Sequence, residues 1–173
     1  QYALVSTAEA VKDGGYDWEK IDTNRVGVIW GSGIGGFKTF QEEMKNFFLG
    51  DGTPRINPFS IQKVIIDIAP GHISMKYGLR GPNFSTVSAC ASATNAMIDA
   101  FNYIRLDIAD IIISGGSEAI INEAGIGGFN AMHALSTRND DPKTASRPFD
   151  KDREGFVAGE GSGTIILEEL EHA

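Results

Sequence analysis

The chain has 173 residues, of which 42% are hydrophobic and 22% charged, as in a globular domain that buries one sizeable core. Its formal net charge of -8 argues against a nucleic-acid partner, because affinity for phosphates depends largely on Lys and Arg. No apolar run approaches the roughly 18 residues that cross a bilayer and no secretory leader opens the sequence, so we expect a cytoplasmic protein without membrane insertion.

The first residues predict a helix that ends at a glycine pair. Apolar residues recur at three-residue spacing over Tyr2–Val11, and Gly14-Gly15 supplies a natural stop. The chain opens at Gln1, already inside this helix, and stops at Ala173, directly after an apolar strand. We therefore interpret it as a piece of a longer polypeptide.

A strand, a glycine-rich turn and a helix follow. Arg25–Trp30 is rich in strand-forming residues and leads into Gly31–Gly36, after which apolar residues over Phe37–Phe48 form a helical stripe. The turn satisfies G-x-G-x-x-G, but dinucleotide binding also requires an acidic residue about 20 positions on, at the end of a second strand. Gly50–Pro54 is instead a turn with no strand before it. We therefore expect no bound cofactor, and a dinucleotide-dependent enzyme is the weaker alternative.

The middle of the chain predicts two further helices around a short strand. The polar loop Gly50–Pro58 precedes an apolar stretch over Val64–Ile73, which predicts a helix that Pro70-Gly71 could interrupt. Asn83–Ser88 is typical of a strand and runs directly into Cys90. The next apolar positions fit one buried helical face: Ala93, Ala96, Met97, Ala100, Phe101 and Ile104.

The C-terminal part predicts two strands separated by a long loop. Asp110–Ser114 is a near-continuous apolar run that ends in glycines, as expected for a strand covered on both faces. Glu118–Gly155 has little periodicity and is predicted to be a loop, and Thr164–Leu167 is a final apolar strand. Strands that alternate with helices predict an α/β layered fold in one domain.

Cys90 is the only cysteine, which excludes an intrachain disulfide and a cysteine-based zinc cluster. A thiol at the first turn of a helix faces unpaired N–H groups and the positive end of the helix dipole, and both favour the thiolate nucleophile. Its small neighbours leave room for a substrate, although the residues alone favour a small buried cysteine. His72, His133 and His172 have no metal-ligand spacing, so we expect structural histidines and no metal.

The segment Val87–Ala93, which contains this cysteine, closely resembles the active-site segment of β-ketoacyl synthases. Tyr77–Pro82 just before it is similar to the family's Y-G-x-x-G-P lead-in. Further blocks in the same order resemble the elongating type that acts on acyl carrier protein: Gly31–Gly36, Gly127–Phe129, Ala134–Asn139, Arg147–Asp150, Arg153–Val157 and Gly159–Gly161. This resemblance covers essentially the whole chain and makes a nucleophilic Cys90 the favoured interpretation.

The resemblance implies a thiolase-like layered fold of two related α/β halves, usually in a homodimer. By this interpretation residues 1–173 form an incomplete first half, the β-ketoacyl synthase N-terminal domain, without the family's C-terminal half. The implied activity belongs to fatty acid synthesis. The cysteine accepts an acyl chain from acyl carrier protein, and a malonyl thioester of the same carrier then loses CO2 and supplies the attacking carbanion.

The resemblance also assigns site residues. It makes Cys90 the acyl acceptor, with its own backbone N–H as one oxyanion donor. It places Gly33, Ile34, Ala89 and Phe129 along the acyl pocket, with Ile34 near the dimer interface. The family's two catalytic histidines, its active-site lysine and the second oxyanion donor all belong to the other half. We therefore expect residues 1–173 alone to lack condensing activity.

Two alternatives stay open beside fatty acid synthesis. One is a polyketide or aryl polyene ketosynthase, which single residues do not separate reliably from the fatty-acid type. Ile120 is bulkier than the small residue often found at that pocket position and suggests a shorter acyl chain. The other is a non-catalytic partner subunit that only shapes chain length. Such partners typically lack the nucleophilic cysteine, so Cys90 weighs against it.

Overall fold

The structure is a computed structural model that describes residues 1–173. The chain folds into two compact units. The first unit consists of Gln1–Gly36, Ile61–Glu118 and Gly161–Ala173, and the second of Phe37–Ser60 and Ala119–Glu160. That residues 1–173 together form one family domain stays a prediction. No helix combines the length and apolar character that a membrane crossing requires.

The first unit is built on one four-stranded sheet with the order β2-β1-β3-β4. Strands β1 (Val26–Gly31), β2 (Asn83–Thr86) and β3 (Ile111–Glu118) run parallel, and β4 (Gly161–Glu168) pairs antiparallel to β3. The four predicted strands are confirmed. Strand β3 extends beyond the predicted glycine end as far as Glu118, so its last two residues continue past Gly31, the end of β1, which pairs with Gly116.

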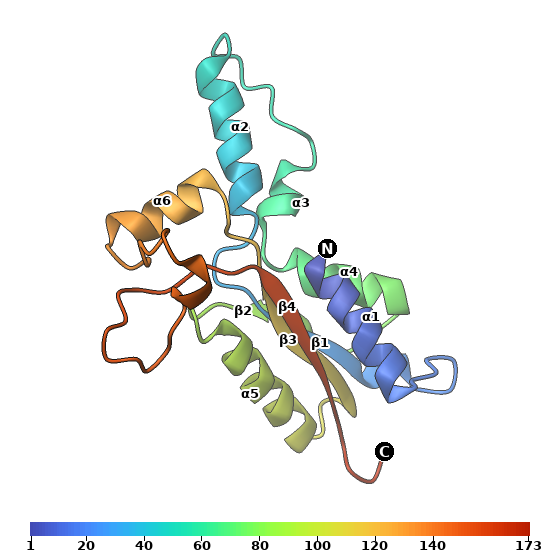
Figure 1. Cartoon of the computed structure of the whole chain (residues 1–173). Helices are drawn as coiled ribbons and strands as arrows, with labels where there is room; N and C mark the ends of the chain where they lie inside the picture. Colours follow the sequence, from blue (N-terminus) through green and yellow to red (C-terminus); the bar gives the residue numbers. More distant parts are fainter. The chain divides into compact units, whose positions relative to one another are not determined.

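Helices cover both faces of this sheet, which makes the first unit a layered α/β structure (Figure 1). Helices α1 (Tyr2–Gly14) and α4 (Ile68–Tyr77) lie on one face, and α5 (Ser92–Arg105) lies on the other. The single helix predicted over Val64–Ile73 is wrong, because α3 (Ser60–Val64) and α4 are separate. Pro70 falls in the first turn of α4, where backbone N–H groups have no partner within the helix, so it does not interrupt α4.

Strand β1 carries the core of the first unit, because successive side chains of a strand point to opposite faces. Val28 and Trp30 are fully buried and pack with Ile73 of α4 on one face. Ile29 packs with the small residues Ala96 and Ala100 of α5 on the other. Burying side chains of this size contributes roughly 1.5–3 kcal/mol each, which fixes α4 and α5 to the sheet.

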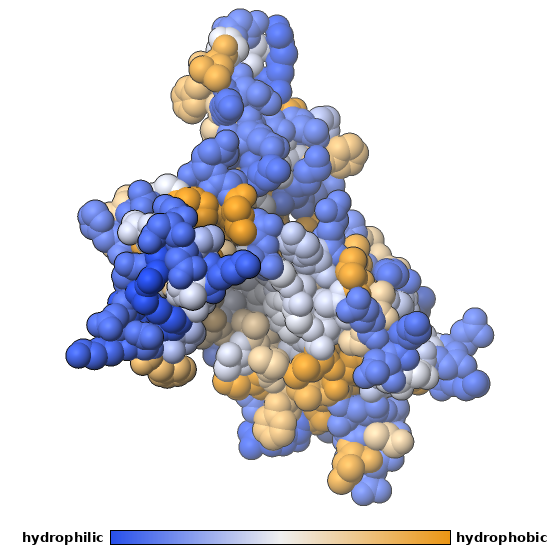
Figure 2. All heavy atoms as spheres, in the orientation of Figure 1, coloured by the Kyte–Doolittle hydropathy of each residue, from blue (hydrophilic) through white to orange (hydrophobic).

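The buried face of α5 is narrower than the sequence predicted. Ala96 and Ala100 are fully buried, but Phe101, placed on the same face by its spacing, is 58% exposed. Ile98 is also half exposed, and Figure 2 shows hydrophobic residues reaching the surface of this unit. The sheet therefore contacts a strip of small residues on α5, and bulkier side chains flank that strip.

The second unit contains α2 (Phe37–Leu49), α6 (Glu123–Ala131) and a short 3-10 turn at Pro142–Thr144. Helix α2 is confirmed. The two helices are joined by Gln41, whose side-chain oxygen accepts the N–H of Ala124 at 2.7 Å and whose amide donates to Glu123. This pair of hydrogen bonds fixes the start of α6 on the middle of α2.

The loop predicted over Glu118–Gly155 is wrong in its first part, where α6 forms. The side chain of Asn122 caps this helix by accepting the N–H of Gly125 at 3.0 Å. A Cβ atom at Gly125 would lie 2.2 Å from the carbonyl oxygen of Ile120, so the close packing here requires glycine. Gly125, one of the glycines that lower the helix propensity of the segment, therefore serves its packing.

Candidate active site around Cys90

Cys90 lies between the end of β2 and the start of α5, which confirms the predicted strand-to-helix junction. Strands β1, β2 and β3 are parallel, so their carboxyl ends meet at the same edge of the sheet as the cysteine. Cys90 itself is exposed. The interpretation as a small buried cysteine, which the residues alone favoured, is therefore wrong.

A sharp turn in the backbone presents the cysteine at this edge. Ala89 has a φ of 50°, in the left-handed region that a residue with a Cβ atom adopts at a cost of about 1 kcal/mol or more. The turn is closed by the N–H of Ala91, which donates to Ser88 at 3.0 Å, and by the N–H of Ser92, which donates to Ala89 at 3.1 Å. Cys90 thus occupies the tip of a strained, hydrogen-bonded turn, a position in which substrates can reach it.

Ser92, the first residue of α5, fastens this turn to the helix. This role was not predicted from the sequence. The Ser92 side chain is almost fully buried, at 3% exposure. The hydroxyl accepts the N–H of Ser88 at 2.9 Å and donates to the carbonyl of Ala89 at 2.7 Å. Asn95, one turn further along α5, donates to the Ser88 hydroxyl at 2.6 Å. The residues on both sides of Cys90 are therefore tied to the same helix.

Replacement of Ser92 by alanine is expected to lower the free energy of unfolding by about 1–3 kcal/mol, because the part-buried N–H of Ser88 loses its partner and the carbonyl of Ala89 loses one of its two hydrogen bonds. The measurement is denaturant unfolding followed by circular dichroism. Thr94→Ala, on the exposed face of the same helix, is the control and should stay within about 0.5 kcal/mol. Equal effects of the two substitutions would contradict the role given to Ser92.

The glycine turn after β1 lies next to the cysteine turn and is held by a carboxylate. The N–H groups of Gly33, Ile34 and Gly35 donate to the side chain of Glu118, at 2.7, 3.0 and 3.3 Å. A Cβ atom on Gly33 would lie 3.4 Å from the carbonyl oxygen of Ala89. The amides that a bound phosphate would need are already occupied by Glu118, which speaks against the dinucleotide alternative.

Four of the five predicted site residues therefore belong to the first unit: Gly33, Ile34, Ala89 and Cys90. Of these, Gly33 approaches Ala89 directly, and Ile34 is 41% exposed beside it in the turn. Phe129 belongs to the second unit, where its ring packs edge-on against Phe156 with the ring centres 5.3 Å apart. Ile120, the suggested chain-length residue, is in the same unit and is buried.

The histidines of the first unit do not assist the thiol by a direct hydrogen bond. His72 is exposed on α4, and the Nδ1 atom of His172 lies 2.7 Å from the carboxylate of Glu168 at the far end of β4. No group of three or more His, Cys, Asp or Glu side chains is placed to hold a metal ion. A cysteine nucleophile usually requires a base or electrostatic partner. Within the first unit no histidine fills that role.

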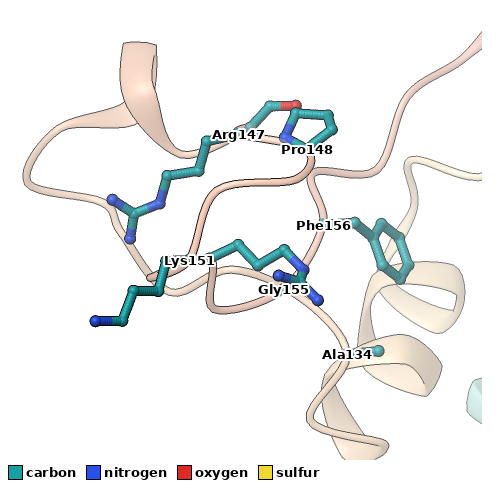
Figure 3. A pocket seen from close by; sticks show the side chains of 8 residues that line it. Ala134, Arg147, Pro148, Lys151, Gly155 and Phe156 are labelled. Atoms are coloured by element: carbon teal, nitrogen blue, oxygen red, sulfur yellow. The ribbon is translucent and has the colours of Figure 1, made fainter.

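The second unit has a cavity of about 560 Å³ that is lined by Ala134, Ser146, Arg147, Pro148, Lys151, Arg153, Gly155 and Phe156. Figure 3 shows the side chains of Arg147 and Lys151 extending away from Phe156. Arg147 donates to the carbonyl of Asp152 at 2.6 Å, and Arg153 donates to the carbonyl of Asp150 at 2.9 Å. Both arginines are therefore used to brace the loop that carries them.

The sequence matches known proteins along its full length. The family described as "Beta-ketoacyl synthase, N-terminal domain" matches residues 1–173. The chain is 46% identical over 173 residues to a protein named 3-oxoacyl-[acyl-carrier-protein] synthase 2 from Staphylococcus aureus, covering 100% of the chain and 42% of that protein. A protein of the same name from Coxiella burnetii is 46% identical over 175 residues, again with 42% of its length covered. The chain thus spans less than half the length of these relatives.

Two solved structures are similar to the fold. A β-ketoacyl synthase from Burkholderia phymatum STM815 superposes with a TM-score of 0.85 at 32% identity, over 99% of this chain and 42% of that one. A type II polyketide ketosynthase, in complex with its acyl-carrier protein and bound to the hexaketide, superposes with a TM-score of 0.89 at 31% identity, over 100% of this chain and 44% of that one. The α/β layered fold of one ketosynthase half, predicted from the sequence, is confirmed.

Proposed function

We propose, for a chain that belongs to the β-ketoacyl synthase family through its N-terminal domain, that residues 1–173 are the nucleophile-bearing part of a condensing enzyme of fatty acid synthesis. The observation that carries the proposal is the exposed Cys90 at the tip of a strained turn before α5. The names of the relatives, 3-oxoacyl-[acyl-carrier-protein] synthase 2, support the choice of reaction and substrates.

In the first step Cys90 takes an acyl group from its carrier. The thiolate sulfur attacks the carbonyl carbon of the acyl thioester, and the carrier leaves as its own thiol after taking a proton. Negative charge develops on the carbonyl oxygen, and we assign the backbone N–H of Cys90 as one donor to it. Gly33, Ile34, Ala89 and Phe129 are proposed to line the acyl chain, with Ile34 near a dimer interface.

In the second step the acyl group leaves the cysteine. A malonyl thioester loses CO2, and the carbanion that remains attacks the carbonyl carbon of the acyl-enzyme. The new carbon–carbon bond forms as the Cys90 sulfur departs, which regenerates the thiol once it is protonated. The groups that promote this step, two histidines, a lysine and a second oxyanion donor, are proposed to belong to a C-terminal half beyond residues 1–173.

The partner proposed for this chain is acyl carrier protein, loaded with acyl or malonyl groups. A similar ketosynthase structure holds its own acyl-carrier protein, which supports this partner. We further propose that the complete enzyme is a cytoplasmic homodimer and that it requires no cofactor or metal. The same structure is a polyketide enzyme, so a polyketide ketosynthase is the second candidate. A non-catalytic partner subunit is disfavoured by the exposed cysteine.

The chain of 173 residues, incubated alone with acyl and malonyl thioesters of acyl carrier protein, is expected to accept the acyl group without forming a 3-oxoacyl product. It has the proposed acceptor, and it lacks the groups proposed to drive decarboxylation. The product is measured by chromatography coupled to mass spectrometry, with a complete 3-oxoacyl-[acyl-carrier-protein] synthase as the positive control. Formation of the 3-oxoacyl product by these residues alone would refute the proposal that the groups that promote decarboxylation lie outside them.

A further inference from the structure

Glu118 holds the glycine turn near the proposed site, and no part in the proposed reaction has yet been given to it. It is the last residue of β3, where it pairs with Gly161 of β4, so its backbone is part of the sheet. Its side chain is half-buried and turns toward the neighbouring strand's glycine turn. One carboxylate oxygen accepts the N–H groups of Gly33 and Ile34, and the other accepts that of Gly35.

The opposite side of the same turn is closed by backbone. The N–H of Gly36 donates to the carbonyl of Val64 at 3.1 Å, and a Cβ atom on Gly36 would lie 1.9 Å from the carbonyl oxygen of Lys63. Gly35 has a φ of 77°, which favours glycine because a side chain would be strained there. The turn is therefore clamped between a fixed backbone segment and a single side chain, the carboxylate of Glu118.

This clamp also sets the distance between the glycine turn and the cysteine turn. A Cβ atom on Gly33 would lie 3.0 Å from the Glu118 carboxylate and 3.4 Å from the carbonyl of Ala89. Gly33 is thus packed between the carboxylate and the residue that precedes Cys90. If the three hydrogen bonds were lost, the exposed Ile34 would be free to move relative to Cys90, because the turn would stay tied only at its two ends, by Ser32 to the carbonyl of Thr86 and by Gly36 to that of Val64.

We propose that Glu118 is a positioning residue, which holds Gly33 and Ile34 at the separation from Cys90 that acyl transfer requires. This inference rests on the proposed function, since it concerns the acyl group that Cys90 accepts. All three hydrogen bonds require a carboxylate, because both of its oxygens accept, whereas the –NH2 group of a glutamine cannot accept the N–H of Gly35. Alanine accepts none of the three.

The test compares two reactions of Cys90 in the protein and its variants. One is acyl loading from acyl carrier protein at several thioester concentrations, and the other is alkylation by iodoacetamide, which is too small to need the pocket wall. Glu118→Ala is expected to slow loading about tenfold or more, because small displacements of positioning groups have effects of this size. Alkylation should change by less than about twofold, since the cysteine turn keeps its own bonds to Ser92. Glu118→Gln, which keeps two of the three bonds, should recover most of the loading rate.

Glu168→Ala is the matched control. Glu168 is also a strand-end carboxylate that accepts side-chain hydrogen bonds, from Tyr16 and His172, but it pairs with Ile111 at the opposite end of β3. The Glu168→Ala substitution should lower the free energy of unfolding and leave the ratio of loading to alkylation unchanged. Unchanged loading in Glu118→Ala, or equal losses in loading and alkylation, would overturn the positioning role alone. Absence of loading in the unsubstituted protein would instead refute the proposed function, and the inference with it.

Discussion

Replacement of Cys90 by serine is expected to reduce acyl transfer to the chain by more than about 10³-fold, because removal of a nucleophile removes the covalent step itself. Serine keeps the size of the side chain but is a far weaker nucleophile without an activating base, and no histidine of the first unit hydrogen bonds to this position. The rate is followed by intact mass after incubation with an acyl thioester of the carrier.

The same substitution should leave the fold intact. Cys90 is exposed and is not part of the buried core, so the free energy of unfolding should change by less than about 0.5 kcal/mol. Because Cys90 is the only cysteine of the 173 residues, the serine variant also shows whether any other residue takes up the acyl group. Loading that persists at the unsubstituted rate would exclude Cys90 as the acceptor.

Replacement of Gly31 by alanine is expected to lower the free energy of unfolding by about 3 kcal/mol. A Cβ atom at Gly31 would lie 2.4 Å from the backbone nitrogen of Ala93 and 2.5 Å from the carbonyl oxygen of Ser92. Neither atom can move without shifting the first turn of α5 away from the sheet. Because Cys90 directly precedes this turn, the variant should also load acyl groups more slowly. Denaturant unfolding and the loading assay measure the two effects.

Gly163→Ala is the control for this experiment. Gly163 is a strand glycine in the same sheet, but a Cβ atom there would have no neighbour within 4 Å. Alanine in place of a strand glycine generally stabilises by roughly 0.5–1 kcal/mol, so this variant should be neutral or slightly more stable. Similar losses at Gly31 and Gly163 would show that the close approach of α5 to the sheet end is not what makes Gly31 necessary.

The parts of the fold that could be predicted from the sequence are those whose packing follows a simple period. Strand β1 was recognisable because Arg25–Trp30 is a short run rich in strand-forming residues, which suits a strand that is buried from Val26 to Gly31. Helix α5 was recognisable from Ala96 and Ala100, although the period alone could not show that Phe101 lies outside the buried strip. Helix α6 was missed because its glycines have low helix propensity, and the cap at Asn122 was the signal that could have revealed it.

The candidate site was only partly predictable for a different reason. Cys90 and its place before a helix are local features, and the resemblance to β-ketoacyl synthases rests on blocks of adjacent residues. Glu118 acts on Gly33, which is far away in the sequence, and the two meet only because β1 and β3 are neighbours in the sheet. Ser92 is one of the small neighbours of Cys90, and its hydrogen bonds could not be predicted, since its partners depend on the left-handed turn at Ala89.

Acyl transfer to Cys90 can be tested by mass mapping of the chain after brief incubation with an acyl thioester of acyl carrier protein. The protein is quenched in acid, digested and analysed by tandem mass spectrometry. We expect the acyl mass on the peptide containing Cys90, and we expect neutral hydroxylamine to release it, as it does a thioester. An unmodified Cys90 peptide beside fully loaded carrier, or an acyl group on any other residue, would contradict this expectation.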